Sequence, residues 1–253
     1  MCRILIAGCL SIVLVSHLAF AQAPNAPASS SVSSAVYYAT ERQVTVYTRP
    51  DSARPYIHLA FREPVHVMAR IGRWSQVRTL DGARGFVASE VLSNVWITVS
   101  KRTRTVSIYR GGQLVKRMAA DLGRNFFADK VRRGSVREPD QWRTPNGVFF
   151  VVKKNAHSQF HRALVLNYPS AEDAERGMKS GLISDQQYQA IVKAEKSFEM
   201  PPMNTALGGW IEIHGHGTGA RNDWTQGCIA VRDEEVDQLF DWVTVGTPVI
   251  IEP

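Results

Sequence analysis

Hydrophobic and polar residues alternate with a period of two in several short runs between residues 36 and 94. A period of two places successive side chains on opposite faces of a β-strand. Turn residues separate the runs, and one of the turns, Asp81-Gly82, is typical of a β-hairpin. The segment closes with a short helical turn at Ser89–Leu92. The runs are Val44–Tyr47, Val65–Met68, Trp74–Val77 and Gly85–Val87. This pattern predicts a small β barrel.

The same alternation starts again at Trp96–Ser100 and continues through Thr105–Tyr109. A turn at Arg110-Gly111-Gly112 joins the second run to a third, Leu114–Leu122. We therefore expect half-buried antiparallel strands here. Further along, the turn Thr144-Pro145-Asn146-Gly147 leads into a predicted strand at Val148–Val152.

Two later stretches change to helical periodicity. Residues 170–198 hold a short helix at Ala171–Met178 and a second one introduced by Ser184, which has capping-box spacing to Gln187. We expect this insertion, about 170–199, to form a flap over a site. Near the C-terminus, Asp233 is the predicted N-cap of an amphipathic helix that ends at Gly246. Its apolar stripe comprises Val236, Leu239, Phe240 and Val243, and the strand Val249–Ile251 follows.

The segment 36–94 resembles a bacterial SH3-like domain. The resemblance rests on the Val-Tyr-x-x-Pro run at 46–50, the Trp-x-x-Val run at 74–77 and Gly85-Phe86-Val87. It implies binding to cell-wall peptide or glycan, and a passive spacer is the alternative.

The N-terminus has the arrangement of a secretory signal. Arg3 precedes an apolar run, Ile4–Phe20, and the small-residue sequence Ala19-Phe20-Ala21 suits cleavage. We expect a signal peptide at 1–21, a flexible leader at 22–35 and export to the periplasm; an uncleaved membrane anchor is the alternative. After cleavage we expect no stable membrane insertion.

The charge of the chain is consistent with an exported protein. The sequence of 253 residues carries 30 basic and 23 acidic residues, a net charge of +7. Loss of residues 1–21 removes only Arg3 and leaves +6. In an exported protein this charge favours an anionic cell envelope over nucleic acid as the partner. The basic run Lys130, Arg132, Arg133 and Arg137 is interpreted as a solvated face, with contact to wall polymer as the alternative.

The chemistry depends on one cysteine. Cys2 and Cys9 lie in the predicted signal, so Cys228 is the sole thiol of the exported part, and it has no internal partner for a disulfide. His214 lies fourteen positions upstream, in a predicted strand at Trp210–His214 that directs Ile211 and Ile213 to the other face. A neighbouring imidazolium lowers the pKa of a thiol to roughly 3.5–7.5. We therefore predict a nucleophile and its base, acting in acyl transfer through a thioester.

The glycines near these residues permit close backbone approach. Gly215 and Gly217 flank His216, which is an alternative base. Backbone N–H groups of Gly227 and Cys228 would stabilise an oxyanion, which in comparable sites contributes about 3–4 kcal/mol. We therefore count Gly227 with the predicted catalytic residues.

Residues 96–253 resemble the L,D-transpeptidase catalytic domain. The motif is His214-Gly215, then Thr225-Gln226-Gly227-Cys228-Ile229-Ala230, an amphipathic helix and Gly246-Thr247-Pro248. The resemblance implies a mainly β fold, in which a small SH3-like barrel precedes a catalytic β-sandwich or barrel at 95–253. It also implies attack by Cys228 on the bond between the third residue and D-alanine of a peptidoglycan stem peptide, with His214 as base and Gly227 as oxyanion donor.

The acceptor in such a reaction is a stem amine, a lipoprotein or water. The resemblance therefore leaves open a peptidoglycan L,D-transpeptidase and a carboxypeptidase or endopeptidase that uses the same site. No cofactor is implied.

Two positions depart from the pattern of the family. Gln226 replaces a histidine of supporting role, and Ala230 replaces an arginine expected to hold substrate. Arg232, two residues further on, is the candidate substitute. The remaining candidates for a supporting or substrate-binding role are Gly215, His216, Trp224, Thr225 and Gln226.

Two other classes of protein stay open. His214 and His216 on one strand face, with Cys228, resemble three zinc ligands with an open position, although no further ligand stands at motif spacing. We expect no metal site. A non-catalytic wall-binding protein is the second alternative.

Overall fold

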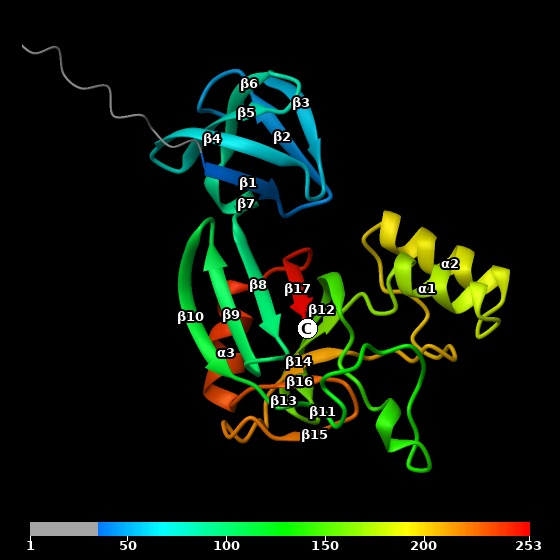
Figure 1. Cartoon of the computed structure of the whole chain (residues 1–253). Coiled ribbons are helices and arrows are strands. Elements are labelled where there is room, and N and C mark those ends of the chain that lie inside the picture. The colour runs from blue at the N-terminus through cyan, green and yellow to red at the C-terminus, as the bar shows by residue number, and fades with distance from the viewer. Residues whose placement is uncertain (1–34) are drawn as a thin grey trace, which may run out of the picture. The chain divides into compact units, whose positions relative to one another are not determined.

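The computed structural model describes residues 35–253. The predicted signal peptide and all but the last residue of the predicted leader lie outside the described residues. The described part is mainly β, as predicted from the sequence, with three α-helices among its strands (Figure 1).

Seven strands in residues 35–93 form one sheet in the order β3-β2-β6-β5-β4-β1-β7. Alternation explains its packing, because Val44 and Val46 are buried on one face of β2 while their neighbours are partly or fully exposed. A separate cluster of buried aliphatic side chains lies behind this face. A 3₁₀ turn, Ser89–Val91, precedes the last strand. The strands are β1 (Ala35–Ala39), β2 (Gln43–Tyr47), β3 (Pro55–Ala60), β4 (Pro64–Ile71), β5 (Trp74–Thr79), β6 (Arg84–Ala88) and β7 (Leu92–Ser93).

A second sheet of eight strands follows, in the order β10-β9-β8-β17-β12-β13-β14-β16. The last strand of the chain, β17, pairs in parallel with β8 and antiparallel with β12, so it lies inside the sheet. The strands are β8 (Val95–Ser100), β9 (Thr105–Arg110), β10 (Gln113–Ala119), β12 (Gly147–Ser158), β13 (His161–Leu166), β14 (Glu212–His214), β16 (Ile229–Ala230) and β17 (Pro248–Glu252).

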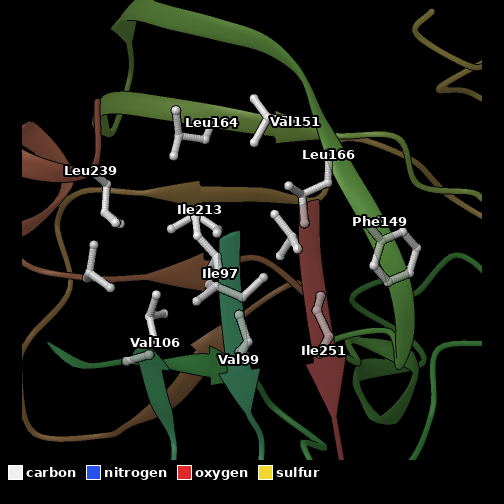
Figure 2. Close-up of a cluster of buried hydrophobic side chains, with 14 of the residues drawn as sticks. Ile97, Val99, Val106, Phe149, Val151, Leu164, Leu166, Ile213, Leu239 and Ile251 are labelled. Carbon is white, nitrogen blue, oxygen red and sulfur yellow. The ribbon is translucent and has the colours of Figure 1, made fainter. Parts of the chain in front are cut away.

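The core of this sheet combines segments from across the sequence. Figure 2 shows side chains of β8, β9, β12, β13, β14 and β17 converging with Leu239 of a C-terminal helix. Ile97 and Val99 are both fully buried on alternate positions of β8. Full burial of one such side chain contributes about 1.5–3 kcal/mol. This core fixes β14 and β16 side by side.

The insertion forms two helices, α1 (Ala171–Lys179) and α2 (Asp185–Lys196), which lie beside each other (Figure 1). Ser170 and Ser184 begin them through capping boxes, the second of which was predicted from the sequence. Ala174, Ile191 and Leu207 belong to a small core of their own. The expected flap is not found, because no residue of either helix lines the cavity described below.

The C-terminal helix α3 (Asp233–Trp242) buries Val236 and Leu239 against the sheet. Its predicted ends need correction. The N-cap is Arg232, whose backbone N–H donates to Glu235, and Asp233 is already inside the helix. The helix stops at Trp242, before Gly246, and the residues between form a turn that leads into β17.

A short parallel pair, β11 (Leu122–Gly123) and β15 (Asp223–Thr225), completes the strands. It brings residues near 122 next to the segment that precedes Cys228. Among residues 35–253, no helix is long and apolar enough to cross a membrane.

Candidate active site

Two neighbouring strands bring the predicted cysteine and histidine together. β14 and β16 run in parallel, with Ile213 opposite Ile229 and His214 opposite Ala230. Cys228 directly precedes β16, so this register places it beside Glu212. β14 is shorter than the predicted strand, and Trp210 lies outside it with a positive φ of 55°.

A cavity of about 550 Å³ opens over this strand pair. Cys228 and His214 both line it, as do the predicted residues Trp224, Thr225 and Gln226. Gly215, His216, Gly227 and Arg232 do not. The wall also includes residues that lie outside the sequence motifs: Lys130, Arg133, Trp142, Phe160, Trp210 and Glu212.

The imidazole of His214 is held in its neutral form. Its Nδ1 lies 2.7 Å from the carbonyl oxygen of Gly215. A carbonyl oxygen only accepts, so Nδ1 carries the proton and Nε2 of the neutral ring is left as an acceptor. The ring of Phe160 stacks on the imidazole at 4.3 Å between centroids, and His214 is 1% exposed. Burial lowers the pKa of His214, and the hydrogen bond to Gly215 opposes this only in part.

The Cys228 thiol is protonated at rest. It donates to the carbonyl oxygen of Trp210 at 3.3 Å. Its pKa is raised to about 12: burial is the largest cause and the Glu212 carboxylate adds to it, whereas a hydrogen bond to the Glu212 backbone and the charge of Lys130 lower it. The thiol therefore needs a base and a cation before it becomes a nucleophile.

Thr225 and Gly227 shape the backbone before the cysteine. The Thr225 hydroxyl donates to the carbonyl oxygen of Cys228 at 2.7 Å and accepts from the Gly227 N–H at 3.2 Å. The Gly227 amide is therefore engaged with Thr225 in this structure, and its role as an oxyanion donor stays a prediction. Glycine is required there for another reason: φ is +127°, and a Cβ would lie 2.5 Å from the carbonyl oxygen of Arg143.

A buried carboxylate organises the loop that leads to Trp224. Asp121 accepts hydrogen bonds from the backbone N–H groups of Thr218 and Asn222, from the Thr218 hydroxyl and from the Trp224 indole. Its own backbone bonds in both directions to Ala230, two residues beyond Cys228. Burial raises the pKa of Asp121, but these hydrogen bonds outweigh it and the net shift is downward. No sequence signal pointed to Asp121.

The remaining predicted residues lie beside the cavity without lining it. His216 is exposed, and its N–H donates to Oδ1 of Asp233 at 2.7 Å, so Asp233 fixes the His-Gly-His loop instead of capping the helix. Arg232 pairs with Glu234 and Glu235 at 3.2 and 2.9 Å. The candidate substitute for the missing arginine is thus committed elsewhere.

The predicted solvated basic face is only partly solvated. Arg137 is exposed, and Arg132 pairs with Glu138 at 2.7 Å on the surface. Lys130, in contrast, is 3% exposed and lines the cavity. The sequence interpretation of Lys130 was wrong, because its loop folds inward between β11 and β12.

The geometry offers no ligand set for a metal. Among the described residues, no group of three or more His, Cys, Asp or Glu side chains is arranged to hold an ion. His216, the second ligand of the zinc alternative, does not line the cavity.

These observations define a mainly β domain in which a thiol and a buried imidazole share one cavity. The catalytic domain family of the L,D-transpeptidases, YkuD, matches residues 94–251. The match covers more than half of the chain, and the chain belongs to this family. No curated protein sequence gave a significant match.

The solved structures that this chain matches have low sequence identity to it. The protein Bd1075 of Bdellovibrio bacteriovorus is 20% identical over 63% of this chain and 47% of its own, with a TM-score of 0.37. An L,D-transpeptidase of Xylanimonas cellulosilytica is 16% identical over 63% and 60%, with a TM-score of 0.36. An L,D-transpeptidase from Mycobacterium smegmatis is 12% identical over 87% and 82%, with a TM-score of 0.39. This chain thus spans about half of the first of these chains and three fifths of the second.

Proposed function

We propose that the protein catalyses acyl transfer on peptidoglycan stem peptides through a thioester on Cys228. One observation carries the proposal: Cys228, directly before β16, and His214, at the end of the neighbouring strand β14, line the same cavity. Membership of the L,D-transpeptidase family supports the substrate class. The bond attacked is the one between the third residue of the stem and D-alanine.

The acylation step uses the protonation states described above. Nε2 of neutral His214 takes the proton from Sγ of Cys228, and the sulfur attacks the carbonyl carbon of the stem peptide. A tetrahedral intermediate forms with its negative charge on oxygen. When it collapses, the C–N bond breaks, and the leaving amine takes the proton back from His214. An acceptor amine or water then attacks the thioester and restores the thiol.

The oxyanion donor in this proposal is the backbone N–H of Cys228, because Gly227 donates to Thr225. Such a donor is the type of group that contributes about 3–4 kcal/mol in other acyl-transfer sites. Thr225 supports it, since its hydroxyl holds the Cys228 carbonyl oxygen at 2.7 Å and so fixes the peptide planes around the cysteine.

Aromatic rings at the cavity wall provide contact area for the stem peptide. Trp210 is 52% and Trp224 is 42% exposed, and both line the cavity. The Trp224 indole N–H is already used by Asp121, so the ring faces a substrate with its apolar part.

Mass spectrometry of the purified protein tests the proposal. Incubation with a disaccharide tetrapeptide, or with a carbapenem, is expected to add the acyl group to Cys228 alone. Cys228→Ala is the matched control and should give no adduct. An absence of any adduct on folded wild-type protein would refute the thioester.

Product analysis with and without an added stem amine distinguishes the two outcomes of the thioester. A cross-linked dimer identifies transpeptidation, whereas a tripeptide alone identifies hydrolysis.

We also propose that the reaction takes place outside the cytoplasm, on the basis of the signal-like N-terminal sequence. Cell fractionation should recover the protein in the periplasm with residues 1–21 removed. Recovery of uncleaved protein in the cytoplasm would contradict this.

A further inference from the structure

Lys130 is a largely buried lysine at the wall of the cavity that contains Cys228. Only 3% of the residue is exposed. Among residues 35–253, no hydrogen bond or salt bridge reaches its Nζ, yet this atom is not one of the fully buried polar atoms that lack a partner. The ammonium is therefore open to the cavity, where it is available to an anionic group.

A second buried lysine shows what a structural role requires. Lys101 is 1% exposed, and its three N–H bonds go to the carbonyl oxygens of Ala128 and Thr144 and to Oδ1 of Asn146. All of its donors are satisfied by the loop it supports. Lys130 has no such set.

The ammonium of Lys130 is directed to the region of the catalytic cavity. Its Nζ and Cε lie near Gly208, where a Cβ would be 3.9 and 3.2 Å away, and Gly208 lines the same cavity as Cys228. The thiolate of Cys228 is close enough to act electrostatically on Lys130. We propose that Lys130 is the cation that stabilises the Cys228 thiolate. This inference rests on the proposed role of Cys228 as nucleophile.

Other charged groups around Lys130 do not take this role. Arg133 donates to the carbonyl oxygens of Thr205 and Met203, and Arg143 donates to those of Asp140 and Asp129. Asp173, which faces Lys130 across a second cavity, is paired with Arg176 at 2.6 Å. Among these charged groups, the Lys130 ammonium is therefore the one available to interact with Cys228.

The cation is needed because the imidazole does not supply one. Burial lowers the pKa of His214, so the ring is neutral before the reaction. When the thiol proton moves from Sγ to Nε2, the ammonium keeps its three protons and offsets the charge on sulfur.

Lys130 can stabilise the Cys228 thiolate only at pH values at which its amine is protonated. Burial lowers its pKa to about 8; Cys228 and Asp173 raise it, whereas Arg133 and Arg143 lower it. The ammonium is therefore charged below about pH 8, and its help to the thiolate is lost as the pH rises above that value.

Alkylation of the full chain tests the inference without peptidoglycan. The rate of Cys228 modification by neutral iodoacetamide is measured from pH 6 to 10 for the wild type, Lys130→Gln, Lys130→Arg and Lys193→Gln. Lys193 lies on the exposed face of α2, so its variant controls for the loss of one charge. A shift of one pKa unit changes the thiolate fraction tenfold.

We expect Lys130→Gln to raise the apparent pKa of Cys228 and to slow alkylation by about tenfold at pH 7. Lys130→Arg should restore most of the rate, and Lys193→Gln should match the wild type. Thermal unfolding identifies variants that are folded. Should Lys130→Gln not fold, the comparison of Lys130→Arg with wild type still applies: arginine keeps its charge above pH 8, so this variant should be alkylated faster than the wild type there, and equal rates would overturn the inference.

A second reagent separates the thiolate from a carboxylate-binding role. In Lys130→Gln, alkylation by negatively charged iodoacetate should slow at least as much as alkylation by iodoacetamide. Slowing of iodoacetate alone would overturn the inference, because Lys130 would then only attract anions. An unchanged iodoacetamide profile would overturn it as well. If the Lys130 variants change alkylation as expected but no muropeptide adduct forms on Cys228, the proposed function would be refuted instead.

Discussion

The indole Nε1 of Trp224 donates a 2.9 Å hydrogen bond to Oδ2 of Asp121, 103 residues earlier in the chain. Three further donors from the loop at 218–222 converge on the same carboxylate. One buried side chain therefore fixes the position of an aromatic wall of the cavity. The strand before Cys228, β15, depends on the same anchor through its pairing with β11.

Asp121→Asn should destabilise the fold and loosen this wall. The amide replaces one accepting oxygen with a donor, so at least one hydrogen bond to a charged group is lost, at a cost of roughly 2 kcal/mol. Chemical unfolding measures this cost, and Asp140→Asn, at an exposed position, serves as the control. An unchanged free energy of unfolding would show that the loop does not depend on the carboxylate.

The lowered pKa of Asp121 also predicts a pH dependence. A carboxyl group with a lower pKa in the folded protein stabilises it above the pKa of the unfolded state, about 3.9, and this contribution is lost as the pH falls through the folded value. The wild type should therefore lose more stability between pH 5 and acid unfolding than Asp121→Asn does.

Thr225→Val should slow acylation of Cys228 more than it harms stability. The isosteric change removes the hydroxyl that joins the Gly227 N–H to the Cys228 carbonyl oxygen. We expect a loss of about 1–2 kcal/mol in unfolding free energy and a slower burst of carbapenem adduct. Thr225→Ser retains the hydroxyl and should restore the rate of adduct formation. Equal rates in the two variants would show that the hydrogen bonds of the Thr225 hydroxyl do not support acylation.

Gly227→Ala should disrupt the site through steric overlap with Arg143. The added Cβ would lie 2.5 Å from a backbone oxygen at a φ of +127°, so we expect a cost of roughly 3 kcal/mol or more. Gly181→Ala is a matched control, since its φ is +71° and no atom lies within 4 Å of the new Cβ. Equal destabilisation of both variants would attribute the effect to φ alone.

Phe160→Ala should move the pKa of His214 back toward its ordinary value near 6.5. The Phe160 ring covers the imidazole, so its removal admits water and weakens the effect of burial. NMR titration of the histidine measures the shift, and Phe127→Ala, an exposed ring, is the control. An unchanged His214 pKa would contradict this explanation.

Burial of His214 also makes the stability of the wild type depend on pH. A histidine with a lowered pKa in the folded state binds fewer protons than in the unfolded state, so stability falls as the pH drops below about 6.5. This loss should be smaller in Phe160→Ala. Unfolding curves recorded from pH 7.5 to 5 check the sign.

The sequence predicted those features of the structure that depend on residues close together in the chain. Alternation located most strands, and the Ser184 capping box located α2, because both depend on neighbouring residues. Cys228 and His214 were also recognisable, since two adjacent strands and a short motif place both at the same cavity. The ends of α3 were misplaced, because Asp233 forms a tertiary hydrogen bond to His216 that no local rule includes.

The rest of the cavity comes from distant segments. Lys130 and Phe160 line it only after β11, β12 and β13 have found their partners, so composition and spacing did not place either residue beside Cys228. Arg232 shows the converse case: its place near the motif suggested a role in binding, yet adjacent glutamates take its guanidinium.

The large sheet can be completed only when the C-terminal strand β17 is present. Residues 248–252 fill the gap between β8 and β12, so neither neighbour has its full set of hydrogen bonds until those residues have been synthesised. A chain interrupted before Pro248 would display two open strand edges, which are templates for pairing with other chains. Loss of even a few residues at this end should therefore produce aggregates instead of a smaller folded protein.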